Sequence, residues 1–234
     1  MFPEFLNLPT PLPLTFQMAI VAGWVGIILL LTEGAYRYTQ LGAEGVRKIL
    51  HIGVGNVILL AWWLQIPAWI GIVASLLAGG VALLSYRIPI LPSINSVRRQ
   101  SWGTFFYAIS IGLLIALFWP LQQPQFAALG ILVMVWGDGW AALVGQRFGR
   151  HPYELWGMKK SWEGSLTMAI VSYLVSGFLL FGVYGNLWQV WATAGVIAIV
   201  ATTLEAFSKY GVDNLTVPLG SATLAFWLIQ NLTS

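Results

Sequence analysis

The chain has 234 residues, of which 58% are hydrophobic and only 8% charged, and its formal net charge is +3. This composition is far too apolar for a soluble globular domain and predicts a protein that resides in a lipid bilayer. The absence of cysteine excludes disulfide scaffolds, thiolate metal sites and cysteine nucleophiles. The basic residues lie in short loops between apolar runs, a pattern typical of membrane topology, so we expect no nucleic-acid partner.

Eight apolar runs are candidates for membrane-spanning helices, because roughly 20 apolar residues cross the ~30 Å hydrocarbon core as a helix. They are residues 16–31, 49–64, 67–85, 104–119, 126–145, 165–183, 188–204 and 215–230. Several runs are short, so seven spans remain possible. The proline-rich residues 1–15 are expected to form a non-helical lead-in. The sequence therefore predicts an all-α, multi-pass transmembrane helical bundle that forms a single integral-membrane domain over residues 1–234.

The charges give this bundle a topology. With eight spans, all eleven lysines and arginines fall on one side of the membrane: Arg37, Arg47, Lys48, Arg87, Arg98, Arg99, Arg147, Arg150, Lys159, Lys160 and Lys209. Tryptophans, which favour the membrane interface, mark span ends on the uncharged side. Because basic loops usually face the cytoplasm, we expect a cytoplasmic functional face, in a plasma or thylakoid-type membrane, and both termini on the non-cytoplasmic side.

The fifth run contains the acid that most needs an explanation. Asp138 is expected about two turns inside the membrane, where an ionisable side chain is costly unless it is paired, hydrated or bound to an ion. Gly137 and Gly139 remove side chains beside it, so that an anion or a metal could approach the backbone. Two interpretations stay open for Asp138, metal ligation and an ion pair with a basic residue on another helix. Small residues then recur at intervals of four and favour close helix packing: Ala141, Gly145 and Gly149.

A polar segment follows this helix and ends in the motif KKSWEG, residues 159–164. Its polar residues include Arg147, Arg150, His151, Lys159, Lys160, Ser161 and Glu163. Lysines beside the N-terminus of a helix form an anion site, for which phosphate is the natural ligand. A carboxylate in the same place suggests a divalent cation that bridges to that phosphate. Membrane topology and anionic lipid could also account for the arginines.

A second polar group opens the second span. If this segment is helical, Glu44, Lys48 and His51 share one face, and Arg47 lies beside them. An i,i+4 ion pair could join Glu44 to Lys48, as one could join Glu33 to Arg37. His51 is either a functional group or a hydrogen-bonded interior histidine.

The third group lies between the last two spans. Glu205 and Asp213 can converge with Asp138 and Glu163 on the cytoplasmic face, where carboxylates next to lysines would form a site for a metal–nucleotide complex. Asp213 or Asn214 could instead cap the last helix, with Pro218 in its first turn. Neither a P-loop nor a G-x-S-x-G motif is present, so P-loop NTPases and the common hydrolases are excluded.

Four segments together resemble the polyprenol kinase family, which includes phytol, farnesol and dolichol kinases and CTP-dependent diacylglycerol kinases. They are RKILHIG at 47–53, GDGWAALVGQRFG at 137–149, KKSWEGS at 159–165 and EAFSKYGVDNLTVPL at 205–219. The short chain is most similar to the phytol kinases of cyanobacteria and plastids. The resemblance implies CTP, or a related nucleoside triphosphate, as the phosphoryl donor. It implies an isoprenoid alcohol as the acceptor, with phytol as the first candidate.

Residue roles follow as expectations. The catalytic group is Asp138, Lys160, Asp213 and His51. Nucleotide and phosphate contacts are assigned to Arg47, Lys48, Gly137, Gly139, Arg147, Lys159, Ser161 and Asn214. Ligands for Mg²⁺ are assigned to Asp138, Asp213, Glu163 and Glu205. Two alternatives remain: a cytidylyltransferase or prenyl-phosphate kinase that acts on a related lipid, and a transporter of an anionic or prenylated solute.

Overall fold

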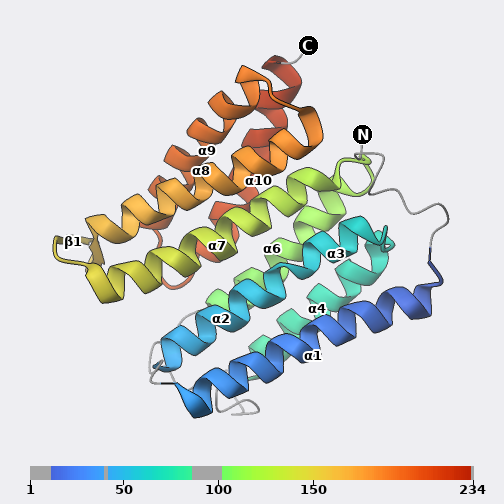
Figure 1. The fold of residues 1–234 in the computed structure, drawn as a ribbon, viewed down its shortest axis with the longest axis horizontal. Coiled ribbons are helices and arrows are strands. Elements are labelled where there is room, and N and C mark those ends of the chain that lie inside the picture. The colour runs from blue at the N-terminus through green and yellow to red at the C-terminus, as the bar shows by residue number, and fades with distance from the viewer. Residues whose placement is uncertain (1–11, 40–41, 86–101, 233–234) are drawn as a thin grey trace.

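The computed structural model describes residues 12–39, 42–85 and 102–232, and it is almost entirely helical (Figure 1). The helices are α1 (Leu14–Tyr38), α2 (Ala43–Gly55), α3 (Val57–Trp63), α4 (Ala68–Ser85), α6 (Gly103–Phe118), α7 (Pro124–Phe148), α8 (Trp162–Tyr184), α9 (Trp188–Ala206) and α10 (Asp213–Leu232). Two short strands, β1 (Pro152–Leu155) and β2 (Met158–Ser161), form an antiparallel hairpin. Within the described ranges, seven helical segments are long and apolar enough to cross a membrane, and α6 is a shorter apolar helix. The predicted all-α, multi-pass bundle is confirmed.

The predicted helix boundaries need small corrections. Leu14 and Thr15 belong to α1, inside the range expected to be non-helical, and residues 1–11 lie outside the described part. The second span begins earlier than the apolar run 49–64 and is interrupted at Asn56, whose side-chain amide donates to the carbonyl of Ile52 at 2.9 Å. These helices extend beyond their apolar runs because residues outside a run can still continue a helix, and the apolar pattern does not mark them.

Helix α7 is the centre of the bundle. Residues 125–135 are buried without interruption, and α7 packs against α8, α10, α6, α2 and α3. A helix that is apolar on every side is stable only when other helices or lipid surround it. Asp138, near the last third of this helix, is therefore carried by the most enclosed element of the molecule.

The outer helices turn large apolar side chains outward. Leu30 in α1 is 75% exposed, and Ile199 in α9 is 69% exposed. A patchwork of exposed large hydrophobic residues on this scale would make a soluble protein aggregate, whereas it suits a surface that contacts lipid. The exposed apolar surface and the central α7 together describe an integral membrane protein.

Close packing of α7 against α8 depends on the small residues at intervals of four. A methyl group added at Gly145 would lie 3.0 Å from the Ser161 hydroxyl, and one added at Gly149 would lie 2.9 Å from it. One added at Gly164 would lie 3.1 Å from the Ala141 carbonyl oxygen. The predicted small-residue interface is confirmed, and it fixes the start of α8 beside the end of α7.

A second close approach joins α7 to α10. The proline inside α10, Pro218, lies in its second turn because the helix begins at Asp213, earlier than expected. A methyl group added at Gly130 would lie only 2.3 Å from the Pro218 carbonyl oxygen and 2.9 Å from the Ala222 methyl. Backbone atoms cannot move aside as a flexible side chain can, so this contact requires glycine.

We expect Gly130→Ala to destabilise the protein by about 1–3 kcal/mol, the usual cost of overpacking a tight core. The matched control is Gly182→Ala in α8, where an added methyl meets open space and surface changes usually stay within about 0.5 kcal/mol. Thermal unfolding of both variants in detergent measures the difference. Equal stability of the two variants would contradict the close contact between α7 and α10.

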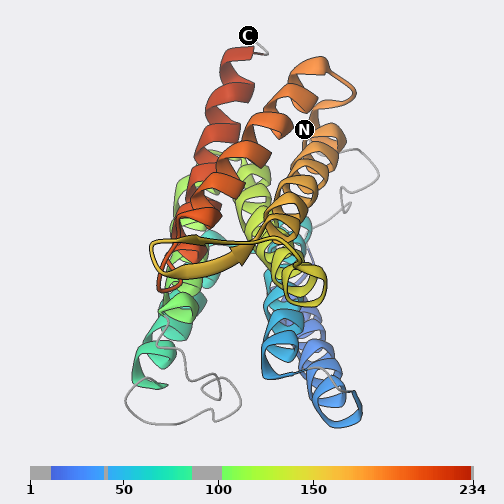
Figure 2. The same ribbon diagram turned by 90° about the vertical axis from the view of Figure 1, so that its left-hand side faces the viewer.

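The connections that carry the polar motifs lie together at one end of the bundle. The end of α1 and the start of α2, the hairpin between α7 and α8, and the α9–α10 connection are all on the left in Figure 1, and Figure 2 views the molecule from that side. Among the described residues, the basic side chains belong to this end, whereas Arg87, Arg98 and Arg99 lie outside the described ranges. The clustering agrees with the predicted segregation of charge, while the orientation of this end in the membrane stays a prediction.

Candidate active site

The contact of α2 with α7 brings Lys48 to Asp138. The Lys48 ammonium donates to Asp138 Oδ2, and the two side chains are only 6% and 15% exposed. A buried charge needs such a partner, because leaving it uncompensated in a low-dielectric interior is costly. Of the two interpretations of Asp138, the ion pair with another helix is therefore present. The expected Glu44–Lys48 pair stays a prediction, because the side chain of Glu44 lies outside the described part of the structure. Glu33 and Arg37 do form the expected i,i+4 pair, at 2.5 Å on the surface of α1.

A second ion pair lies beside the first. Lys160 in β2 reaches the end of α9, where it donates to Glu205 Oε1 at 2.5 Å and to the Glu205 backbone carbonyl. These side chains are 17% and 12% exposed. The hairpin is thus attached to α9 by a charged contact that also neutralises Glu205.

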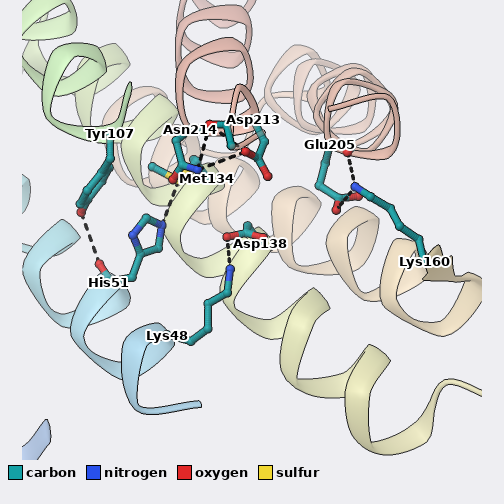
Figure 3. A network of polar contacts seen from close by, with 10 residues as sticks. Lys48, His51, Tyr107, Met134, Asp138, Lys160, Glu205, Asp213 and Asn214 are labelled. Atoms are coloured by element: carbon teal, nitrogen blue, oxygen red, sulfur yellow. Dashed lines mark hydrogen bonds and ion pairs between the residues drawn. The ribbon is translucent and has the colours of Figure 1, made fainter. Parts of the chain in front are cut away.

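The start of α10 supplies the third carboxylate. The Asp213 backbone amide donates to the Ser208 hydroxyl at 2.5 Å, and Asp213 Oδ1 accepts from the backbone and side-chain amides of Asn214, both at 3.1 Å. Asp213 is the first residue of α10, and its side chain accepts from the next residue, whereas an N-cap side chain accepts from the amide two or three residues on. The capping interpretation therefore stays a prediction. The bonds to Asn214 use only Oδ1, and Figure 3 shows the carboxylate directed toward the space between Asp138 and Glu205.

The three acids form one electrostatic group. Asp213 interacts through charge with Asp138 and with both lysines, and Glu205 interacts with Asp138 and Asp213. The participants come from α2, α7, β2, α9 and α10, so only the folded bundle assembles them (Figure 3). We call Lys48, Asp138, Lys160, Glu205 and Asp213 the charged cluster. Three carboxylates and two ammonium groups in one partly buried place can bind an anion and a cation together.

His51 joins this cluster on the side of α2 and α6. Its Nε2 lies 3.1 Å from the sulfur of Met134, one turn before Asp138 in α7. Its ring centre lies 4.4 Å from that of Tyr107, whose hydroxyl donates to the His51 backbone carbonyl at 3.3 Å. His51 also interacts electrostatically with Asp138 and Arg47. These contacts hold the His51 ring beside the charged cluster, and its role in the chemistry stays a prediction.

The carboxylates of the charged cluster suit a metal ion that is also bound by the phosphates of a ligand. Among the described residues, no three His, Asp or Glu side chains are grouped closely enough to hold a bare metal ion. Mg²⁺ usually binds one or two protein carboxylates and takes its other ligands from water and substrate phosphates. Asp138 and Asp213 match that donor set, with Glu205 next to them. The residues therefore fit a magnesium–triphosphate complex better than a dedicated metal cage.

Several predicted site residues occupy other places. Glu163 Oε1 pairs with Nδ1 of His151 at 2.7 Å, and that histidine is 76% exposed. Lys159 is exposed on the face of β2 opposite to Lys160, across the hairpin from Glu154. Arg147 is exposed at the end of α7, 5.5 Å from the ring centre of Phe148. Within the described part of the chain, no contact joins any of these three residues to the charged cluster, so their roles stay predictions.

Three further residues that the sequence predicts as phosphate contacts are engaged in helix packing or helix capping. A methyl group at Gly137 would lie 2.6 Å from the sulfur of Met168, and one at Gly139 would lie 2.6 Å from Ile52. Ser161 is the N-cap of α8 and accepts from the Gly164 amide at 3.1 Å. The two glycines bring α8 and α2 close to Asp138, which is a different use from exposing the backbone to a ligand.

Some neighbours of the cluster carried no sequence signal. Tyr107 and Met134 lie within apolar runs, where a tyrosine or methionine is an ordinary core residue. Ser208 is one hydroxyl within a polar loop. Knowledge that α6 contacts α2 would have indicated Tyr107 as a neighbour of His51. Nothing in the spacing of either segment predicts that contact.

Known proteins were compared with the whole chain. No protein-family model matches it, and no solved structure matches it. A phytol kinase of Synechocystis sp. is 53% identical over 220 residues, which are 94% of this chain and 94% of that protein. Phytol kinase 1, chloroplastic, of Arabidopsis thaliana is 28% identical over 235 residues, which are 89% of this chain and 74% of the plant protein. Identity above one half over nearly the full length of the cyanobacterial protein places this chain in the phytol kinase family.

Proposed function

We propose that this protein transfers the γ-phosphoryl group of a nucleoside triphosphate to the hydroxyl of phytol. CTP is the first candidate for the phosphoryl donor. The observation that supports this most directly is the charged cluster itself, which combines two lysines with three carboxylates at one end of a membrane bundle. Phosphoryl transfer requires mainly positioning and neutralisation of charge, which such a cluster supplies. The family membership supports the kinase reaction and disfavours the transporter alternative.

The described residues divide the work in this proposal. Lys160 and Lys48 hold the triphosphate oxygens, and Lys48 shares its ammonium group between Asp138 and the triphosphate. Asp138 and Asp213 would hold Mg²⁺, with Glu205 assisting, and the bound ion would neutralise phosphate charge. The alcohol oxygen attacks the γ-phosphorus, the bond to the β-phosphate bridging oxygen breaks, and the nucleoside diphosphate leaves. His51 or a carboxylate of the cluster accepts the hydroxyl proton.

The position of the cluster suits an acceptor dissolved in lipid. Asp138 belongs to a helix that is long and apolar enough to span the membrane, while Lys160 lies in a hairpin outside the spans. The prenyl tail can therefore stay in the hydrocarbon while the hydroxyl meets the nucleotide near the membrane surface. We propose that this surface is cytoplasmic, because the basic loops collect there.

The test uses the purified full chain in detergent or lipid nanodiscs. Labelled CTP, UTP and ATP are each offered with phytol, phytyl phosphate, farnesol, geranylgeraniol and diacylglycerol, and the lipid products are identified by mass spectrometry. We expect phytyl phosphate and CDP in equal amounts. A product carrying CMP with release of pyrophosphate would identify a cytidylyltransferase, and turnover of phytyl phosphate alone would identify a prenyl-phosphate kinase. Either result would overturn the proposal.

A further inference from the structure

A cavity outside the charged cluster has no role in the chemistry above. Its volume is about 380 Å³, within the roughly 300–1,000 Å³ of small-molecule sites. It lies between the hairpin turn, the end of α9 and the start of α10, and its lining includes Trp156, Phe207, Ser208, Lys209 and Tyr210. The walls are mostly apolar and aromatic, with one lysine among them.

The aromatic side chains of this cavity are presented rather than buried. Trp156 is 68% exposed and Phe207 is 45% exposed, and their ring centres lie 5.4 Å apart at 60°. Lys209 places its ammonium 5.0 Å from the centre of the Tyr210 ring. Exposed aromatic rings next to a cation form a surface on which a flat π-system can stack.

The backbone holds two of these aromatics in an unusual conformation. Trp156 and Tyr210 have φ of 49° and 56°, in the left-handed region that side chains other than glycine rarely adopt. Such conformations are retained where the surrounding structure enforces them, and they cluster at functional sites. In the described residues, only two other non-glycine residues have a positive φ. They are Gln65 and Gln122, which belong to different turns.

The cavity shares a wall with the charged cluster. Ser208, which lines it, accepts the hydrogen bond from the Asp213 amide. Leu204 and Val212 line it too and directly precede Glu205 and Asp213 in the chain. Trp156 belongs to the same hairpin as Lys160, which reaches Glu205. A ligand with its phosphates on the cluster would therefore extend its other end toward these aromatic rings.

We propose that this cavity holds the nucleobase of the nucleoside triphosphate, which stacks on Trp156 while Phe207, inclined at 60° to Trp156, contacts the edge of the base, an inference that rests on the proposed kinase function. The hydroxyls of the walls are already engaged, because Thr203 donates to the Ile199 carbonyl at 2.8 Å and Thr216 donates to the Val212 carbonyl at 3.1 Å. Recognition of the base therefore comes mainly from stacking, with Lys209 next to the ribose.

The experiment compares nucleotide use with use of a phosphate chain that lacks a base. In Trp156→Ala we expect the KM for CTP to rise about 10-fold or more, as loss of one aromatic–base stack predicts. The turnover at saturating CTP and the KM for phytol should stay within about 2-fold of wild type. Competitive inhibition by inorganic tripolyphosphate should be unchanged, because that ligand needs only the charged cluster. Trp156→Phe should restore most of the affinity for CTP.

The control variant is Trp162→Ala. Trp162 is also an exposed tryptophan at the same end, 67% exposed and 5.4 Å from the Tyr153 ring, and it does not line the cavity. We expect it to leave the KM for CTP unchanged. If Trp156→Ala does not remain folded in detergent, Phe207→Leu carries the same test.

The possible results separate this inference from the proposed function. An unchanged KM for CTP in Trp156→Ala and Phe207→Leu, or equal weakening of CTP and tripolyphosphate, would overturn the nucleobase site. A raised KM for phytol alone would show that the cavity holds the prenyl chain instead. A wild-type protein that transfers no phosphoryl group from any nucleotide would refute the proposed function itself.

Discussion

Asp138→Asn is expected to reduce phosphoryl transfer by at least about 100-fold, the usual cost of removing one preorganised group that stabilises transition-state charge. The change keeps the size of the side chain but removes a charge from the middle of the cluster. It also leaves Lys48 buried without its counter-ion, so we expect a loss of stability of about 3–5 kcal/mol. Initial rates with CTP and phytol, and thermal unfolding in detergent, measure the two effects separately.

A double substitution distinguishes catalysis from stability. Lys48→Met together with Asp138→Asn removes both charges, so we expect unfolding to return toward the wild-type temperature while activity remains lost. Glu33→Gln is the matched control, because it removes a carboxylate from an ion pair whose side chains are more than half exposed and surface pairs contribute only about 0–1 kcal/mol. Recovery of activity in the double variant would show that Asp138 serves only to balance Lys48.

The bundle was predictable because its main signal is one-dimensional. Long apolar runs separated by charged loops require membrane helices, whatever their packing. The Ala141, Gly145 and Gly149 series was also predictable, since spacing along one helix fixes which residues share a face. Each of these features depends only on neighbours in the sequence.

The hairpin was missed for a local reason. Its turn places Trp156 and Gly157 at φ of 49° and 78°, and turns of this kind usually carry Asn-Gly or Asp-Gly. Tryptophan in the first position gives no turn signal. The short strands on either side contain charged and aromatic residues without a clear alternation, so the sequence pattern predicts a loop for this segment.

The pairings within the charged cluster could not be predicted, although most of its members were. Lys48 has an acid one turn earlier in its own sequence, yet it pairs with Asp138, which lies 90 positions away. The i,i+4 spacing favours the nearer acid as the partner of Lys48. Burial instead favours Asp138, because two opposite charges in an apolar interior compensate each other when they pair. Only the packing of α2 against α7 decides between them.

The two adjacent lysines of KKSWEG provide the second large expected effect. Successive side chains of a strand point to opposite faces, and in β2 this turns Lys160 inward to Glu205 and leaves Lys159 exposed. We expect Lys160→Met to lower kcat/KM for CTP by about 100-fold or more. Lys159→Met, the same change one residue away, should lower it by no more than about 5-fold, because an exposed charge acts through screened electrostatics. Steady-state kinetics over a range of CTP concentrations measure both.

Lys160→Met also leaves Glu205 unpaired, so the loss of activity needs a structural control. The variant Lys160→Met with Glu205→Gln removes the stranded carboxylate and should recover stability. If Lys160 contacts the triphosphate, this double variant stays inactive and binds tripolyphosphate weakly as an inhibitor. If Lys160 only attaches the hairpin to α9, activity returns with stability. A larger effect of Lys159→Met than of Lys160→Met would place the triphosphate on the outer face of the hairpin, away from Asp138 and Asp213, and the charged cluster would then not be the catalytic site.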